Sequence, residues 1–152
     1  MKIALGADHG GFAVKQKIKA VLTGDLSHSV IDMGIYKEEP CDYPDHALLV
    51  AQAVATDEAT FGIMIDGAGI GSTMACNKVP GIRAALCYDL FTATNAREHN
   101  NANVLCLGGQ TVGPGHLIQI VKTFLTVPYA GGRHDRRVQK IMGIEKRYLR
   151  EI

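Results

Sequence analysis

Strand-like and helix-like segments alternate along the whole chain, and this alternation limits the possible folds more than any other feature. Apolar runs typical of strands occur five times, at residues 2–7, 29–34, 61–66, 82–87 and 103–109. Segments with helical spacing or helix-start signals follow them, at 11–22, 45–55, 72–79, 89–99 and 113–125. Repeated strand–helix units predict a parallel sheet covered by helices on both faces. We expect one domain over residues 1–152, an α/β protein with a Rossmann-like three-layer α/β/α sandwich around a five-stranded parallel sheet.

The composition excludes several classes of protein. A net charge of +1 argues against a general binder of nucleic acid or of membrane surfaces. The N-terminus lacks the apolar region of a signal peptide, and no apolar run approaches ~18 residues. The four cysteines form no C-x-x-C pair, which favours reduced thiols: Cys41, Cys76, Cys87 and Cys106. We expect a cytoplasmic protein.

The predicted fold also indicates where a ligand would bind. In open α/β sheets, ligands bind at the carboxyl ends of the strands, near the point where the strand order reverses. This rule selects Asp8 and His9 after the first strand and Tyr43 after the second. It also selects residues 66–72 after the third strand and His99 just before the fifth. His9 and His99 lie where a general acid or base would be placed, and no spacing resembles a metal site.

The segment after the third strand, Asp-Gly-Ala-Gly-Ile-Gly-Ser at 66–72, is a glycine-rich loop. Gly67, Gly69 and Gly71 expose successive N–H groups, which can stabilise a phosphate or the oxyanion of a reaction intermediate. The loop does not match the dinucleotide pattern G-x-G-x-x-G, because Ser72 occupies the last glycine position. Asp89 lies at about the right distance for a ribose-binding acid, so binding of NAD stays open as an alternative.

Asp66 admits two interpretations. A carboxylate at the end of a strand commonly caps the helix that follows, without any catalytic role. Alternatively, Asp66 is a general base, which would need its pKa raised by burial to abstract protons effectively at neutral pH. The sequence leaves both interpretations open.

The C-terminal region is basic and amphipathic. From Arg133 onward, seven of the sixteen Lys and Arg residues fall within twenty positions. Arg133 and Arg137 are four residues apart and could hold one phosphate from one face of a helix, or could simply be solvated. A last helix begins near His134, with an apolar stripe formed by Val138, Ile141, Tyr148, Leu149 and Ile152. We expect this helix to dock on a partner subunit, and packing on its own domain is the alternative.

Five runs spread over the chain resemble, in the same order, the ribose-5-phosphate isomerase B family, which includes the subunits of galactose-6-phosphate isomerase. They are ADHGGF (7–12), DYPDHA (42–47), NKVPGIRAALCYD (77–89), REHNNANVLCLGG (97–109) and GGRHDRRV (131–138). The resemblance implies aldose–ketose isomerisation of a sugar phosphate through a cis-enediolate, with no metal or organic cofactor. It also implies a homodimer, possibly a tetramer formed as a dimer of dimers, with active sites between subunits.

The resemblance assigns roles to particular residues. Asp8 and His9 would contact the sugar or its phosphate, and Tyr43 would line the site. The backbone of Gly67, Ala68, Gly69, Ile70 and Gly71 would stabilise the enediolate oxygen. His99 would assist ring opening with Asn100 nearby, and Arg133 and Arg137 would hold the phosphate.

The chain departs from the family pattern in three respects. Many members carry their catalytic cysteine where this chain has Asp66, and another branch uses a glutamate where this chain has Ile70. Asp66 is therefore the expected base. A frequent threonine is replaced by Ala68, and a usual arginine is replaced by Gln110, which could alter substrate preference.

Three hypotheses follow from the sequence. The first is an isomerase, with ribose 5-phosphate as the favoured substrate and a tetrose, allose or galactose 6-phosphate as the alternative. The second is a catalytically silent sugar-phosphate-binding subunit. The third is a nucleotide-binding module that uses the glycine loop and Asp89.

Overall fold

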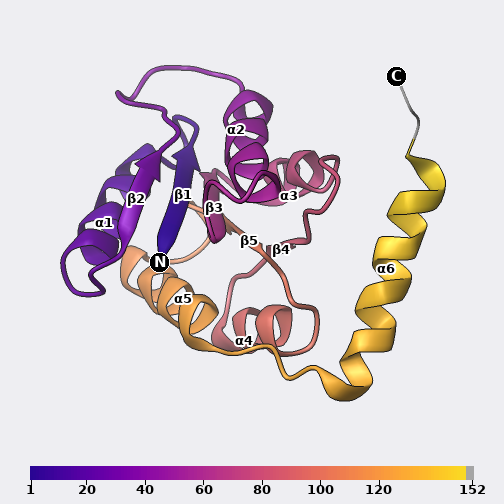
Figure 1. The fold of residues 1–152 in the computed structure, drawn as a ribbon. Coiled ribbons are helices and arrows are strands. Elements are labelled where there is room, and N and C mark those ends of the chain that lie inside the picture. The colour runs from indigo at the N-terminus through magenta and orange to yellow at the C-terminus, as the bar shows by residue number, and fades with distance from the viewer. Residues whose placement is uncertain (150–152) are drawn as a thin grey trace.

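The computed structural model describes residues 1–149 and contains the predicted alternation of strands and helices (Figure 1). In chain order the elements are β1 (Lys2–Ala7), α1 (Phe12–Thr23), β2 (Ser29–Asp32), α2 (Tyr43–Ala55), β3 (Phe61–Asp66), α3 (Ile70–Cys76), β4 (Ala84–Leu86), α4 (Leu90–Glu98), β5 (Val104–Gly108), α5 (Pro114–Thr126), the 3-10 turn η1 (Gly132–His134) and α6 (Asp135–Tyr148). The strands form one five-stranded sheet in the order β2-β1-β3-β5-β4, and every pairing is parallel. The predicted five-stranded parallel α/β fold is confirmed.

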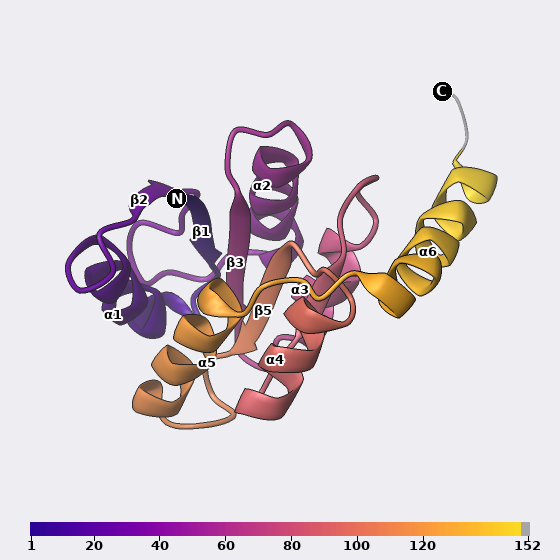
Figure 2. The same ribbon diagram turned by 60° about the horizontal axis from the view of Figure 1, so that its bottom comes forward.

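Two apolar cores lie on opposite faces of the sheet, because the strand side chains alternate in direction. On one face, Ile3 and Leu5 of β1 pack with α1, α4 and α5, which lie along the same side of the sheet in Figure 2. On the other face, Ala4 of β1 and Met64 of β3 pack with α2 and α3. The three-layer arrangement therefore follows from near-continuous apolar strands that are covered on both sides.

Several predicted boundaries differ from the structure. The edge strands β2 and β4 are shorter than the predicted runs 29–34 and 82–87. The predicted helix 72–79 begins earlier, at Ile70, and ends at Cys76, where the N–H groups of Lys78 and Val79 bond back to Ala75 and Cys76 and turn the chain. An edge strand pairs on one side only, so pairing ends sooner there than in the central strands.

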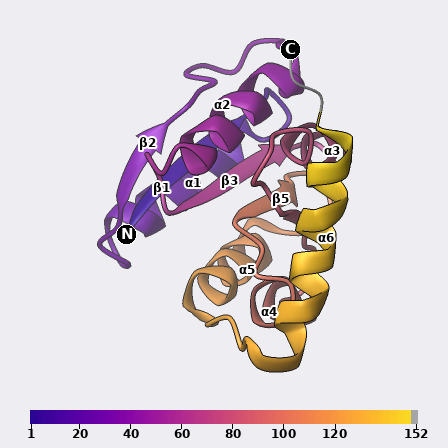
Figure 3. The same cartoon turned by 45° about the vertical axis from the view of Figure 1, so that its right-hand side comes forward.

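Helix α6 stands apart from the rest of the molecule. It contains no buried residue, and it runs past α4 and α3 at the side of the sheet (Figures 1 and 3). Glu145 accepts the N–H of Gly81, and the Arg83 guanidinium lies 3.4 Å from the Met142 sulfur. The predicted stripe residue Ile152 lies outside the described residues. Within residues 1–149, no helix has the length and apolar character needed to cross a membrane.

Candidate active site

The loops that follow β1, β3 and β5 meet at the carboxyl edge of the sheet. Asp8 donates its N–H to Ile65 at 3.1 Å, Gly109 donates to the Asp66 carbonyl at 2.7 Å, and Gln110 donates to the Gly67 carbonyl at 3.0 Å. The connection from β1 goes to one side of the sheet and the connection from β3 goes to the other, so the strand order reverses between these two strands. This crevice is the expected ligand position of such a sheet.

Asp66 ends β3 and is buried, with 5% of its surface exposed. One carboxylate oxygen, Oδ1, accepts the N–H of Gly69. The other, Oδ2, accepts the N–H of Ser72 at 3.1 Å and its hydroxyl at 2.6 Å. The predicted capping contact is therefore confirmed, because the carboxylate closes the turn that leads into α3. A carboxylate held in this way can also serve as a base.

Close neighbours require two glycines of this loop, Gly69 and Gly71. Gly69 has a φ of +81°, and a Cβ there would collide with the Leu86 side chain and approach the backbone at Leu107. The phenol of Tyr43 lies directly against Gly71 and would collide with any side chain there. The amide of Gln110 lies beside Gly67, with its oxygen 3.5 Å from the position that a Cβ would take. The loop, Tyr43 and Gln110 therefore form one surface.

Asp8 and His9 border the same loop. Asp8 is buried and its Oδ1 accepts the N–H groups of Gly10 and Gly11, at 2.8 and 3.2 Å. His9 is exposed, and its Nδ1 accepts the N–H of Cys41 at 3.3 Å, so the neutral ring carries its proton on Nε2. The residues gathered here, which we name the carboxyl-edge cluster, are Asp8, His9, Tyr43 and residues 66–71.

The prediction that His99 lies at the carboxyl ends of the strands is wrong. His99 follows the last residue of α4, a helix that returns from the end of β4 to the start of β5. It therefore lies at the amino edge of the sheet, together with Asn100. The carboxyl-edge cluster lies at the far ends of strands β3 and β5, roughly one strand length away (~17–20 Å). Within one chain the two groups do not meet.

A second group of predicted residues surrounds His99. The His99 ring stacks on that of His134, with centroids 4.1 Å apart and planes at 16°. Its Nδ1 lies 3.0 Å from the Asn95 amide nitrogen, and its Nε2 lies 3.5 Å from Glu98 Oε2. The N–H of Ala130 bonds to the Glu98 carbonyl at 3.0 Å and fixes the segment before η1 beside α4.

Arg133 and Arg137 belong to this second group, but they do not share one helix face as predicted. Arg133 lies in η1 and Arg137 lies in the first turns of α6, and both are exposed. Burial, and then the charges of His99, Arg133 and Arg137, hold the pKa of His134 below its ordinary value. We name His99, Asn100, Arg133, His134 and Arg137 the amino-edge cluster.

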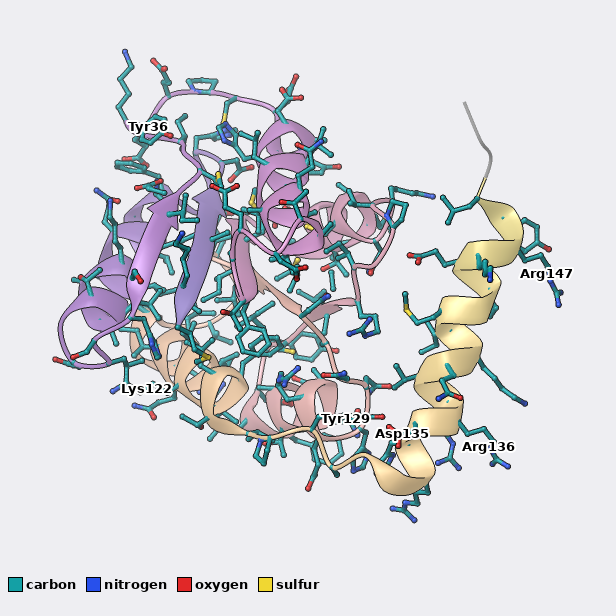
Figure 4. All side chains as sticks on the ribbon, viewed as in Figure 1. Tyr36, Lys122, Tyr129, Asp135, Arg136 and Arg147 are labelled. Atoms are coloured by element: carbon teal, nitrogen blue, oxygen red, sulfur yellow. The ribbon has the colours of Figure 1, made fainter. Side chains whose placement is uncertain are left out.

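A cleft of about 1170 Å³ separates α6 from the body of the molecule. Its apolar lining comes from Ile82, Leu86 and Phe91 on one side and from Ile141 and Tyr148 of α6 on the other. At one end the lining reaches Asn95 and Asn100, which flank His99. The outer side of α6 is basic, and Arg136 and Arg147 point away from the body in Figure 4.

Two contacts near these clusters are not predicted by the sequence. Ser72 belongs to the selected loop 66–72, but the sequence does not indicate its hydrogen bonds to Asp66. His134 lies inside the run GGRHDRRV and was not assigned a role; only its nearness to His99 in space reveals it.

Two other candidates have structural explanations. Asp89 forms a capping box with Thr92, accepting its N–H and its hydroxyl, each at 2.7 Å. This bonding accounts for Asp89 without a nucleotide ribose.

The Cys106 thiol is near Asp66, but its contact with the Cys76 thiol, together with burial, raises the pKa of Cys106 well above its ordinary value. Cys106 is therefore a neutral thiol and not a thiolate base.

Comparisons with known proteins agree with this geometry. A family model described as Ribose/Galactose Isomerase matches residues 3–141. The ribose-5-phosphate isomerase B of Escherichia coli (strain K12) is 44% identical over 146 residues, which cover 96% of this chain and 97% of that protein. The structure of Clostridium thermocellum ribose-5-phosphate isomerase B has a TM-score of 0.96 at 48% identity and covers 98% of this chain and 100% of that one.

A further solved structure is that of ribose-5-phosphate isomerase B from Mycoplasma genitalium with bound ribulose-5-phosphate. It has a TM-score of 0.91 at 42% identity and covers 95% of this chain and 96% of that one. Sequence and fold thus agree over almost the whole length of both proteins. The chain belongs to the ribose/galactose isomerase family and is therefore an enzyme, an aldose–ketose isomerase of the sugar-phosphate type.

Proposed function

We propose that this protein interconverts ribose 5-phosphate and ribulose 5-phosphate through a cis-enediolate, with Asp66 as the base. The relatives named for this reaction support the substrate, as does the Mycoplasma structure with bound ribulose-5-phosphate. The observation that carries the role of Asp66 is a buried carboxylate at the crevice between β1 and β3, next to Asp8 and the glycine loop.

In the proposed mechanism, the Asp66 carboxylate removes the proton from C2 of the open-chain aldose. The electron pair of the C2–H bond forms the C1–C2 double bond, and O1 takes the negative charge of the enediolate. The hydroxyl proton on O2 then moves to O1, and Asp66 returns its proton to C1, which leaves a ketone at C2. No electron leaves the sugar, so the reaction consumes no oxidant or reductant.

Among the backbone N–H groups of residues 67–71, that of Gly69 already donates to Asp66. The others would stabilise the enediolate oxygen, because preorganised donors are most effective where charge develops in the transition state. Asp8, His9 and Tyr43 would contact the sugar from the same side. His99 would open the furanose ring by giving a proton to the ring oxygen, and Arg133 and Arg137 would bind the phosphate.

These roles require two copies of the chain, because the carboxyl-edge and amino-edge clusters lie at opposite edges of one sheet. We propose a homodimer in which α3 of one copy occupies the cleft beneath α6 of the other. Ile70 and Met74 lie four residues apart on α3 and are 54% and 64% exposed, so they offer an apolar ridge to the apolar cleft. Since α3 follows Asp66 directly, this docking brings Asp66 of one copy toward His99 of the other.

Proton exchange tests the proposal. Ribose 5-phosphate incubated with the protein in D₂O should acquire deuterium at C2 and form ribulose 5-phosphate. Asp66→Asn, which keeps the shape of the side chain, should lower both rates by about a hundredfold to ten-thousandfold and leave substrate binding in place. Exchange at the wild-type rate in this variant would exclude Asp66 as the base. Binding without any exchange by the wild-type protein would instead favour the silent subunit.

A second candidate is isomerisation of another aldose phosphate. The neutral amide of Gln110 beside Gly67, where relatives usually have an arginine, favours a substrate that presents a hydroxyl group at this point. A panel of tetrose, pentose and hexose phosphates compared by kcat/KM decides between the candidates. A kcat/KM for allose 6-phosphate or for a tetrose phosphate that exceeds the value for ribose 5-phosphate would replace the first proposal.

A further inference from the structure

Ser72 is the most completely buried polar residue near the proposed base. It has 0% of its surface exposed and is the third residue of α3. Its hydroxyl donates to Asp66 Oδ2 at 2.6 Å, and its N–H donates to the same oxygen at 3.1 Å. The mechanism above gives this residue no role.

The hydrogen bonds distribute unequally over the two carboxylate oxygens. An ionised carboxylate has about four lone-pair sites, two on each oxygen. Both sites on Oδ2 are taken by Ser72, whereas Oδ1 accepts only the N–H of Gly69. One lone pair of Oδ1 therefore accepts no hydrogen bond from the loop.

We propose that Ser72 is a positioning residue for proton transfer, and this inference rests on the proposed role of Asp66. By occupying Oδ2, the Ser72 hydroxyl fixes the rotation of the carboxylate and leaves Oδ1 as the basic atom. When the C2–H bond breaks, the proton forms an O–H bond at Oδ1. It then remains there because Oδ2 already accepts two hydrogen bonds, and it is returned from Oδ1 to C1 when the new C–H bond forms.

The surroundings of Ser72 hold its hydroxyl in place. The Gly69 carbonyl accepts the Thr73 N–H at 3.2 Å and the Thr73 hydroxyl at 2.7 Å, so the backbone closes the turn of residues 69–73 even without that hydroxyl. A base must be held within a fraction of an ångström of its proton, since a displacement of ~1 Å can cost about a hundredfold in rate. The hydrogen bond from the Ser72 hydroxyl to Oδ2 therefore controls the orientation of the Asp66 carboxylate.

Thr73 also supplies a matched control. Ser72→Ala removes the hydroxyl bond to the carboxylate but keeps the N–H bond, and Thr73→Ala removes a hydroxyl bond from the same turn without touching the carboxylate. Alanine is a better helix former than serine or threonine, so both variants should fold, which thermal unfolding checks.

We expect Ser72→Ala to lower kcat for ribose 5-phosphate about tenfold to a hundredfold, with KM within about twofold of wild type. With substrate deuterated at C2, less of the label should reach C1 and more should be lost to water. Thr73→Ala should keep kcat and label transfer within about twofold of wild type.

Three results would overturn the inference: a wild-type kcat in Ser72→Ala, equal losses in both variants, or a rise in KM with kcat unchanged. These outcomes are distinct from failure of the proposed function. If the wild-type protein exchanges no proton, or if Asp66→Asn exchanges at the wild-type rate, both proposals fall. If Asp66→Asn is inactive while Ser72→Ala behaves as wild type, only the role of Ser72 falls.

Discussion

The carboxyl-edge cluster and the amino-edge cluster differ in how completely the chain itself builds them. At the carboxyl edge, Asp8 and Asp66 are buried and bonded to backbone N–H groups, and loops from three strands are tied together. At the amino edge, Arg133 of η1 and Arg137 of α6 are exposed, and α6 has no buried residue. Folding of one chain therefore orders the carboxyl-edge half of the proposed site. The amino-edge half would be completed only by the surface of a second copy.

Mixing two inactive variants tests this division with the largest expected effect. Asp66→Asn and His99→Gln should each lose activity by about a hundredfold or more. If each active site combines Asp66 of one copy with His99 of the other, a heterodimer contains one site with both native residues. Random reassociation of equal amounts makes about half of the dimers heterodimers, so activity should recover to about a quarter of wild type.

The measurement is ribulose 5-phosphate formation after the two variants have been unfolded and refolded together. Each variant refolded alone is the control. A mixture that stays as inactive as its parents would mean that Asp66 and His99 act within one chain, or that His99 has no catalytic role.

A charge placed in the α6 cleft tests the surface that should join the two clusters. Ile141 lines the cleft, whereas Gln139 lies on the outer side of α6 with Arg136 and Lys140. Ile141→Asp should dissociate the dimer and abolish most activity, because a carboxylate would then lie in a desolvated apolar contact. Gln139→Asp, which adds the same charge outside the cleft, should keep the wild-type mass and activity. Light scattering after gel filtration measures the mass, and a dimeric Ile141→Asp would contradict the proposed interface.

The position of Lys15 allows the stability of the carboxyl edge to be tested. Lys15 is fully buried and bonds to Asp32 at 2.7 Å and to the Ile35 carbonyl at 2.5 Å. The N–H of Ile35 bonds to the Ala7 carbonyl at 2.8 Å, so this anchor lies one residue from Asp8. Although burial opposes it, hydrogen bonds from Lys15, from Lys19 and from Gly34 hold the pKa of Asp32 below its ordinary value.

Lys15→Met should therefore lower the free energy of unfolding by about 3 kcal/mol, because it leaves a carboxylate and a carbonyl without their buried donor. Lys19→Met is the matched control. Its ammonium bonds to the same carboxylate at 2.9 Å but is 41% exposed, so the loss should stay below about 1 kcal/mol. Urea unfolding of both variants measures the difference. Equal losses would mean that burial of Lys15 adds nothing to the ion pair.

Features that depend on local sequence could be predicted, whereas contacts between distant segments could not. The alternating segments were predictable, as were Asp8 directly after β1 and Asp66 at the end of β3, because local apolar periodicity and the carboxyl-end rule depend only on nearby residues. His99 was misplaced because the rule was applied to a residue that precedes a strand. The stacking of His99 on His134 could not be predicted, since it brings the end of α4 against a segment 35 residues later in the chain. The hydrogen bond of Ser72 to Asp66 could not be predicted, because it depends on the turn of the loop and not on a repeat in the sequence.

The smallest expected effect is a change in the pH dependence of stability, and it should come from His134 of the amino-edge cluster. Burial and the nearby charges of His99, Arg133 and Arg137 lower the pKa of His134, and Glu98 opposes this only in part. The unfolded chain therefore binds a proton more readily than the folded chain, so stability should fall as the pH drops below about 6.5. His134→Gln should weaken this pH dependence of Tm, whereas replacement of the exposed His116 by glutamine should leave it in place. An unchanged dependence in His134→Gln would mean that the protonated ring is accommodated as easily beside His99 as in water. A weaker pH dependence of Tm in His134→Gln would instead mean that positive charges already lie close together in the amino-edge cluster. A phosphate binds most strongly where positive charges are gathered in this way.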